Sequence, residues 1–329
     1  MKKIFFYNIF IITIILILLE FSIRIFNLIE LQGYDKNVFY QKDNISFHSP
    51  NIFLTVTGKK LKTDKNGFRI PLKNYKYNKK LENLLILGDS VSYGVFVEEK
   101  KTLAGSLRKK IDKNLFNASV IGHTTVSYNY LIKKYEEELP IENVLIFLCL
   151  NDIIDKEGVI KKEDLKYISH HRDDNIFIQF LRNKIFIDIN LFLRNKSYLF
   201  NLLKSISTNN VKRYFDYITP YYQSNEYVNL YKNNIREIIE FSSLKKLNVK
   251  FVLLPYKYQI IKNCNSDLMA PQNVVQGVFN KLDYELFDLS KECCDKGQDE
   301  FFLNFDPMHL SPLGHAFVSE LLLKKKIIN

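Results

Sequence analysis

Three short apolar runs, two of them leading into polar residues and the third into Pro255, place the tightest limit on how this chain folds. The runs are 83–87, 143–150 and 249–254. Each is apolar on both faces of an extended chain, which is typical of parallel strands buried between helices. Weaker strand candidates are 115–121 and 300–303. The chain is therefore expected to build a buried parallel sheet.

Helical patterns separate these runs. They cover 100–111, 127–138 and 227–247, and the last has apolar residues at spacings of three and four. Strands that alternate with helices across short turns indicate an α/β fold, with helices on both faces of a parallel sheet. The sequence therefore predicts a doubly wound α/β domain over 81–329.

Composition fits a sizeable globular core. Of the 329 residues, 47% are hydrophobic and 25% are charged, which excludes wholesale disorder. The length fits one large domain with additions, or two modest ones. The net charge of +11 suits nucleic acid, anionic lipid or an acidic polymer. No nucleic-acid motif accompanies it, so no nucleic-acid partner is expected.

The N-terminus, 1–28, predicts a transmembrane anchor. Lys2 and Lys3 precede an almost wholly apolar run, Ile4–Leu19, and Glu20 and Arg24 follow at helical i,i+4 spacing. A spanning helix needs roughly 20 apolar residues, so this segment suffices if Glu20 and Arg24 pair near the outer interface. The absence of a small-x-small cleavage site favours a retained anchor over a signal peptide. The lysines favour a cytoplasmic N-terminus and an exported domain; the alternative is an amphipathic surface helix.

Two further segments lie outside the predicted sheet. Residues 29–80 are polar and irregular in pattern, and they are expected to form a basic juxtamembrane segment, mostly a solvated linker with a turn at Asn66-Gly67. An insertion at about 155–223 is rich in Phe and Ile with interspersed Arg and Lys. Either it covers the sheet or active site as helices, which we favour, or it lies on a membrane surface.

Polar residues after two of the predicted strands, and near the C-terminus, suggest acyl-transfer chemistry. Ligands of open parallel sheets bind beyond the carboxyl ends of the strands, which is where Ser90 stands. A serine nucleophile needs a base, and the base needs an acceptor that holds its tautomer. Asp306 and His309, three residues apart, meet both needs. Each motif alone is weak, because Ser and Asp are also common helix caps.

Such a site also needs fixed donors for a developing oxyanion. Candidates are the backbone N–H groups of Ser90 and Gly122 and the side-chain amide of Asn151. Glycine permits close backbone approach to a ligand. His123 and the pair His170-His171 are interpreted instead as solvated or loop histidines.

In their order along the chain, these blocks resemble the SGNH (GDSL) hydrolase family. The blocks are Gly88-Asp89-Ser90, the segment 117–122, Asn151-Asp152 and Asp306-x-x-His309. The resemblance covers roughly 81–328 without the insertion and implies a flavodoxin-like three-layer α/β/α fold.

By the family pattern, Ser90 is the nucleophile, His309 the base and Asp306 its orienter. Ser90, Gly122 and Asn151 supply the oxyanion donors, and Asp89 and Asp152 support the site.

The Asn-Gly-Phe-Arg segment at 66–69 and the anchor helix resemble the membrane-anchored bacterial branch of this family, which is often linked to modification of cell-surface polysaccharide. One position departs from the pattern. Cys149 stands where the third block usually has Gly, which could shift Asn151 and lower activity.

The cysteines and short motifs indicate no metal or cofactor. No pair of cysteines has C-x-x-C spacing, and the chain has neither a P-loop nor a G-x-G-x-x-G motif. Outside the cytosol, Cys264 could form a bridge with either Cys293 or Cys294. Cys149 is expected to be a small buried residue.

The leading expectation is a single-pass membrane protein whose extracytoplasmic domain is a serine esterase or acyltransferase. Its substrate would be an acylated glycan of the cell surface, above all an O-acetylated one, or a small ester, and its partners would belong to the polysaccharide machinery of the envelope. One alternative is a non-catalytic glycan-binding or assembly protein on the same scaffold. Another is a membrane-associated lipase or lysophospholipase.

Overall fold

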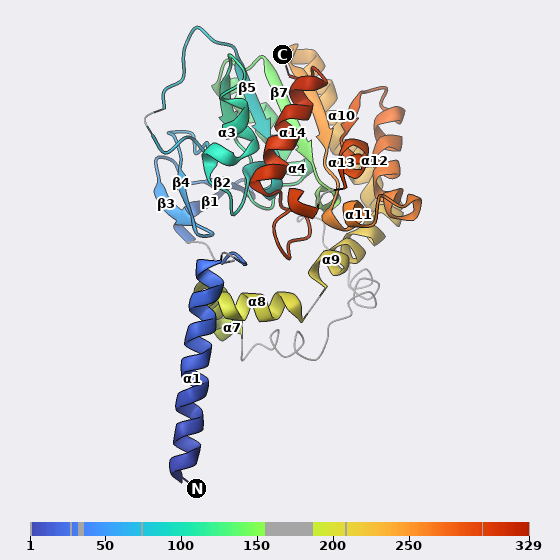
Figure 1. The fold of residues 1–329 in the computed structure, drawn as a ribbon. Coiled ribbons are helices and arrows are strands. Elements are labelled where there is room, and N and C mark those ends of the chain that lie inside the picture. The colour runs from blue at the N-terminus through green and yellow to red at the C-terminus, as the bar shows by residue number, and fades with distance from the viewer. Residues whose placement is uncertain are drawn as a thin grey trace.

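A computed structural model gives the fold of the chain (Figure 1). It describes residues 2–26, 28–31, 36–73, 75–154, 187–207, 209–297 and 299–328. The strands are β1 (Phe39–Lys42), β2 (Ile45–His48), β3 (Phe53–Val56), β4 (Lys59–Lys62), β5 (Asn83–Leu87), β6 (Asn114–Asn117), β7 (Asn143–Leu148), β8 (Asn248–Leu253) and β9 (Leu286–Asp288). The helices are α1 (Lys2–Ile25), α2 (Ser90–Tyr93), α3 (Leu103–Leu107), α4 (Thr125–Glu138), α7 (Ile187–Lys196), α8 (Tyr198–Ile206), α9 (Asn210–Ile218), α10 (Asn225–Lys245), α11 (Lys257–Ile261), α12 (Ala270–Lys281), α13 (Ser290–Lys296) and α14 (Pro312–Lys324).

Strands β5 to β9 form the predicted parallel sheet. Their spatial order is β6-β5-β7-β8-β9, and every neighbouring pair is parallel. Numbered along the chain, this is the 2-1-3-4-5 order of flavodoxin-like folds. The predicted α/β fold class is therefore confirmed. The order reverses between β5 and β7, so their carboxyl ends flank the crevice where such sheets bind ligands.

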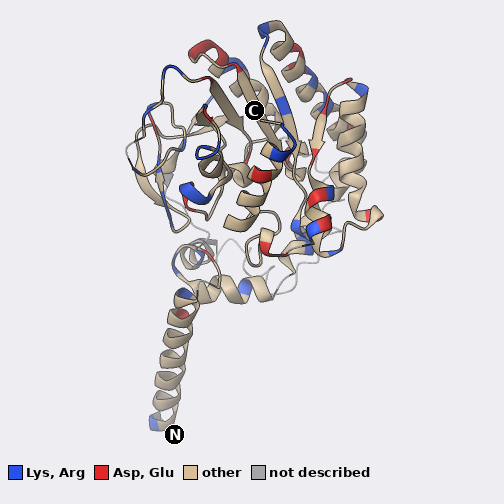
Figure 2. Ribbon diagram, turned by 45° about the horizontal axis from the view of Figure 1, so that its top comes forward, with Lys and Arg blue, Asp and Glu red and all other residues tan. Residues whose placement is uncertain are grey.

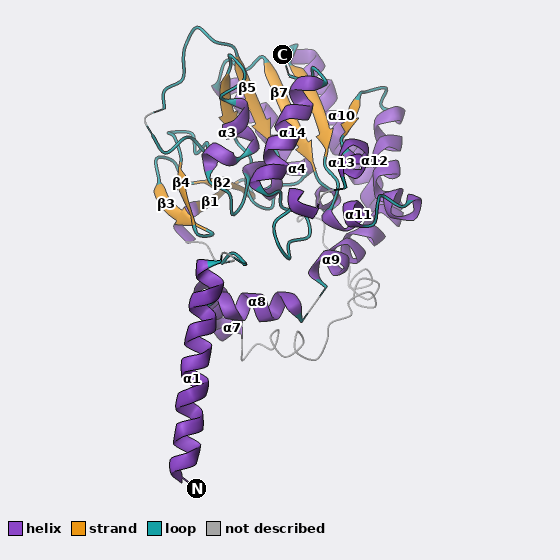
Figure 3. Ribbon diagram, in the orientation of Figure 1, coloured by secondary structure: helices purple, strands orange, loops and turns teal. Residues whose placement is uncertain are grey.

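Helices cover both faces of this sheet (Figure 3). The crossover from β5 to β6 runs in the opposite direction to the later ones, so right-handed connections place α3 and α4 on opposite faces. Contacts between elements agree with this, because α14 packs on α3, whereas α10 packs on α4 and α12. The three layers enclose one continuous hydrophobic core.

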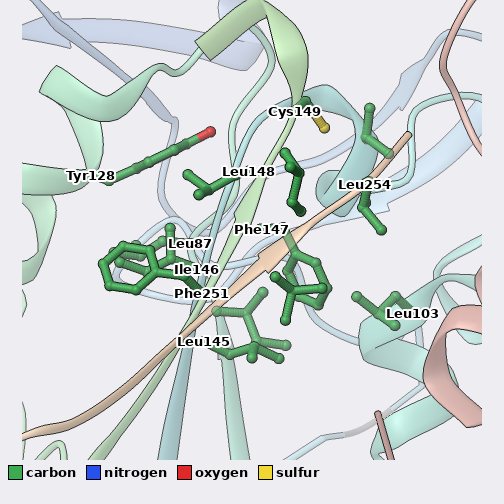
Figure 4. Packing of buried hydrophobic residues seen from close by; sticks show 14 of the residues in the cluster. Leu87, Leu103, Tyr128, Leu145, Ile146, Phe147, Leu148, Cys149, Phe251 and Leu254 are labelled. Carbon is green, nitrogen blue, oxygen red and sulfur yellow. The ribbon is translucent and has the colours of Figure 1, made fainter. Parts of the chain in front are cut away.

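The centre of the core explains why the strands could be predicted. All of β5 and nearly all of β7 are buried, and Leu145, Ile146 and Phe147 pack with side chains from both helical layers (Figure 4). Burying such a side chain contributes about 1.5–3 kcal/mol. An unbroken apolar run is thus what a central parallel strand requires.

The weaker predictions fared unevenly. The strand expected at 115–121 is the shorter β6, and the helix expected at 100–111 contains only α3, preceded by a 3₁₀ turn. The strand expected at 300–303 is wrong: this region forms a 3₁₀ helix, and only Phe302 bridges Leu310. The fifth strand is β9, whose three residues are half-buried and lack an apolar run.

Residues 29–80 were expected to be irregular and mostly solvated, and this is incorrect for much of the segment. They form two antiparallel hairpins, β1–β2 and β3–β4. Val38, Val56 and Leu61 are buried with Tyr93 and Val95 in a second, smaller core. The segment was misread because its strands have four residues each, and β4 carries three lysines beside its one buried residue, Leu61.

Arg69 joins this segment to the sheet domain. Its side chain is 2% exposed, and its guanidinium donates to the carbonyl oxygens of Tyr93 (2.7 Å), Gly94 (3.0 Å) and Val97 (2.7 Å). The same group stacks over the Tyr93 ring, 4.5 Å from its centroid. Arg69 thus fixes the turn that leaves α2.

Helix α1 projects from the domain at the side where the strands end (Figure 1). Its stretch Lys3–Ile25 is long and apolar enough to cross a membrane, and within the described residues it is the one helix that meets this test. The middle of α1 carries no charged residue (Figure 2). Glu20 and Arg24 pair at 2.9 Å, as their spacing predicted.

The cysteine pairing left open by the sequence is Cys264 with Cys294. Their Cα atoms are 6.0 Å apart, and the bridge links the turn after α11 to α13. Cys293 and Cys149 are free and buried.

Replacing Arg69 by Met tests its structural role. The change keeps an apolar stem but leaves three buried carbonyl groups without donors, so we expect the free energy of unfolding to fall by about 2–5 kcal/mol. Denaturant unfolding in detergent measures it, with the exposed Lys73→Met as the matched control. Equal stability of the two variants would contradict the role.

Two adjacent cysteines give a matched test of the disulfide. Cys294→Ser should expose Cys264 to alkylation and, because the bridge spans 30 residues, lower the free energy of unfolding by about 3–4 kcal/mol. Cys293→Ser should leave Cys264 protected. The opposite pattern in mass spectra of alkylated protein would assign the bridge to Cys293.

Candidate active site

Ser90 occupies the turn between β5 and α2. It is the first residue of α2, and Asp89 caps the helix by accepting a hydrogen bond from the Val91 N–H at 2.8 Å. Gly94 ends this helix after one turn in a left-handed conformation, with φ of 79°. The sharp turn places the Ser90 hydroxyl at the carboxyl edge of the sheet.

Ser90, His309 and Asp306 form a continuous hydrogen-bonded chain. The Ser90 Oγ lies 2.8 Å from the His309 Nε2, and the His309 Nδ1 lies 2.7 Å from the Asp306 Oδ2. The Asp89 carboxylate is 3.5 Å from Ser90 Oγ, too far to compete for the hydroxyl proton. Ser90 and His309 are 219 positions apart in the sequence, and the fold brings them into direct contact.

Local hydrogen bonds hold the loop that carries Asp306 and His309. The second Asp306 oxygen accepts from the backbone N–H groups of His309 (2.7 Å) and Met308 (2.9 Å). The buried Lys257, just after β8, binds this loop at two points: its N–H donates to the Pro307 carbonyl oxygen and its Nζ to that of Leu303. Through these bonds, the end of β8 fixes the position of the His309 ring relative to the sheet.

The charge of Asp306 sets the protonation of His309. Burial acts to lower the pKa of His309, but the charge and hydrogen bond of Asp306 outweigh burial and raise that pKa above its ordinary value. Burial acts to raise the pKa of Asp306, but His309 and two backbone N–H groups outweigh it and lower that pKa. The pair therefore stabilises an imidazolium, which a base needs after it accepts a proton.

Asn151 lies opposite Ser90 at the end of β7. It belongs to a 3₁₀ turn, Leu150–Ile153, and its Nδ2 donates to Asp89 Oδ2 at 3.0 Å. The Tyr256 hydroxyl donates to Asn151 Oδ1 at 2.9 Å, which determines which end of the amide faces Asp89. One N–H of the amide is thus held by Asp89, and the other remains to serve a ligand.

Asp152 and Cys149 support the turn that presents Asn151. The Asp152 carboxylate accepts from the Cys149 N–H (2.8 Å) and from the Tyr128 hydroxyl (3.1 Å). Burial, then the charge of Asp89, raises the pKa of Asp152 well above its usual range. Cys149 has φ of −122°, an extended conformation that any residue adopts, so the backbone there does not require glycine.

The predicted site residues line one shared cavity of about 800 Å³. Ser90, Gly122, Asn151, Asp306 and His309 all line it, and Gly122 has φ of 82°. Its opposite wall comes from the insertion and includes Arg194, Lys204, Ser205, Asn210, Arg213, Tyr214 and Tyr217. The segment 155–186 of that insertion, with His170-His171, lies outside the described residues.

Within the described ranges, the other histidines do not join the hydrogen-bonded chain from Ser90 to Asp306. His123, expected to be a solvated or loop histidine, does lie in a loop but is buried rather than solvated, and its Nε2 lies 2.7 Å from the Ser46 carbonyl oxygen. Burial lowers the pKa of both His48 and His315 to about 3, so both are neutral. Among the described residues, no group of three or more His, Cys, Asp or Glu side chains is placed to hold a metal ion.

Two positioning residues escaped the sequence analysis. Tyr256 lies just beyond the predicted run 249–254, so the strand-end rule that selected Ser90 and Asn151 would have found it. Arg69 stood within the segment 66–69 that the sequence analysis noted, but nothing in the sequence shows that its side chain reaches the α2 turn.

Comparisons with known proteins give likeness of fold only. No family model and no curated protein sequence matches the chain. Similar solved structures include the acetyl xylan esterase AlAXEase, with 12% identity, a TM-score of 0.43, and coverage of 74% of this chain and 99% of that one. Esterase EstA from Pseudoalteromonas sp. has 14% identity, a TM-score of 0.41, and coverage of 75% and 100%. A lipolytic G-D-S-L family member from Veillonella parvula has 11% identity, a TM-score of 0.41, and coverage of 75% and 100%.

The titration of His309 tests the electrostatics of the site. Asp306→Asn removes the charge that raises the His309 pKa, so the midpoint should move to lower pH. NMR of the six histidine rings measures it, and His48 and His315 should stay neutral near pH 7 in both proteins. A midpoint that is unchanged or moves upward would refute this account of the pair.

Proposed function

We propose that the chain is a serine esterase or O-acyltransferase that works through an acyl-enzyme on Ser90. The observation that carries the proposal is the hydrogen-bonded chain from Ser90 Oγ through His309 to Asp306, set in a large cavity. A hydroxyl, an imidazole and a carboxylate in this order form the arrangement that activates serine toward a carbonyl carbon. The resemblance to SGNH hydrolases points to the same chemistry.

The reaction would proceed in two balanced halves. Ser90 Oγ attacks the ester carbonyl while His309 Nε2 takes its proton, and Asp306 stabilises the resulting imidazolium. The N–H groups of Ser90 and Gly122 and the Asn151 amide stabilise the oxyanion. His309 then protonates the leaving alkoxide, which leaves the acyl group on Ser90. Water or a sugar hydroxyl then attacks the acyl carbon while His309 takes its proton, and His309 returns that proton to Ser90 Oγ as the bond between Oγ and the acyl group breaks.

The proposed substrate is an O-acyl group, with O-acetyl first to be tested, on a cell-surface polysaccharide. The cavity, about 800 Å³, accepts a molecule far larger than an acetyl ester. The resemblance to the membrane-anchored bacterial branch favours a glycan and partners in envelope polysaccharide assembly. Hydrolysis and transfer would share all of these residues and differ in the acceptor.

We also propose that α1 is a retained anchor, with the N-terminus in the cytoplasm and the domain outside. Lys2 and Lys3 precede the apolar run, as the positive-inside rule requires. The Cys264–Cys294 bridge fits an oxidising compartment.

The test of the serine mechanism uses full-length protein in detergent and p-nitrophenyl acetate. Ser90→Ala should reduce the rate by about a thousandfold or more, because the nucleophile is lost while the fold is kept. Ser92→Ala, two residues further along α2, is the matched control. Equal rates for wild type and Ser90→Ala would remove the mechanism and leave glycan binding on this scaffold as the remaining function.

A further inference from the structure

The exposed and buried faces of α8 are reversed relative to a helix that faces water. Asn201 and Ser205, four residues apart, are 1% and 5% exposed. Leu203 and Ile206 lie on the other face and are 53% and 63% exposed. A surface helix in water buries its apolar stripe and exposes its polar one. The exposed face of α8 therefore suits an apolar environment.

Helix α7 extends this surface. Ile189 and Phe192 are exposed on it, whereas Arg194 lines the cavity beside Ser205 of α8. The Asn201 side-chain amide donates to the carbonyl oxygen of Arg194 at 2.9 Å, so the two helices are held together. We call the exposed apolar set, Ile189, Phe192, Leu203 and Ile206, the apolar ledge.

The ledge is attached to α1 at a defined level. Glu20 of α1 accepts hydrogen bonds at the start of α8 from the Ser197 hydroxyl (3.0 Å) and from the N–H groups of Tyr198 (3.0 Å) and Leu199 (2.8 Å). A carboxylate there satisfies free N–H groups and complements the helix dipole. Arg24 donates to the Lys196 carbonyl oxygen and lies over the Tyr198 ring.

This level corresponds to the outer boundary of a bilayer. The apolar run Ile4–Leu19 rises about 24 Å as a helix, close to a hydrocarbon core of about 30 Å. Glu20 and the start of α8 directly follow that run. In Figure 1, α8 runs across the outer end of α1 rather than along it. A helix in this orientation lies in the plane of the membrane surface.

We propose that the apolar ledge is inserted in the outer interface of the membrane that α1 crosses. The occupant of the ledge is lipid, because the ledge continues from the apolar surface of α1 and lies at its charged end. This inference rests on the proposed anchor. Its consequence is that α7 and α8 are at once a membrane contact and a wall of the cavity that holds Ser90 and His309.

The chain contains no tryptophan, which allows a direct test with single probes. Full-length protein with Leu203→Trp is placed in phosphatidylcholine vesicles, and ordinary lipid is replaced by lipid brominated close to the headgroup. We expect the brominated lipid to lower the emission intensity, and the emission in either lipid to lie to the blue of that of a water-exposed tryptophan, since an interfacial helix buries its apolar face about 5–10 Å deep. Ile206→Trp repeats the measurement on the same face.

Two control positions separate this inference from the anchor. Phe10→Trp, in the middle of α1, should be quenched best by lipid brominated near the chain end. Leu244→Trp is 78% exposed at the amino edge of the sheet, just before β8 and opposite the cavity, and should not be quenched.

Quenching at Phe10→Trp without quenching at Leu203→Trp and Ile206→Trp overturns the ledge and keeps the anchor. That pattern together with dimers in the vesicles would assign the ledge to a second copy of the chain, which also overturns the proposal. Loss of quenching at Phe10→Trp defeats the anchor itself and the ledge with it.

Discussion

The buried carboxylate of Asp89 ties together the ends of the two central strands. One oxygen caps α2 behind Ser90, and the other accepts from the Asn151 amide beyond β7. A buried charge is costly unless it is hydrogen-bonded, so these donors are a condition of its burial. The crevice where strand order reverses therefore has a fixed width, and Ser90 and Asn151 keep their spacing.

The position of a carboxylate also explains why the pKa values of two histidines move in opposite directions. His315 is fully buried, and His309, six residues before it, is partly buried in the cavity wall. His315 Nδ1 accepts from the Leu103 N–H, and its Nε2 has no hydrogen-bond partner among the residues that the structure describes, so burial lowers its pKa to about 3. His309 has Asp306 against its Nδ1, which reverses the direction. The Asp306 carboxylate thus distinguishes His309, which can accept a proton near neutral pH, from His315, which stays neutral there.

The sheet and the positions of Ser90 and Asn151 at strand ends could be predicted because they depend on local sequence, whereas His309 was assigned from its spacing to Asp306 and from the family resemblance. A central strand must be apolar on both faces, and its end must be polar if it meets a ligand. β9 could not be predicted, since an edge strand of three half-buried residues has no such pattern. Nor could the hairpins at 39–62 or the reach of Arg69, because their burial arises from contacts with distant residues. The reversal of α8 becomes visible only when exposure is known.

The two hairpins change what an anchor does for this protein. Between α1 and the sheet, the hairpins pack around the smaller core. Arg69 joins this folded segment to the turn after α2, and Lys59 of β4 forms an ion pair with Glu30. With α1 in a bilayer, these contacts would hold the cavity at a fixed distance from the membrane surface. Encounters would then be confined to a thin layer. For the proposed acyl substrate, turnover would then be governed by the number of acyl groups per unit area of surface, not by their concentration in the surrounding medium.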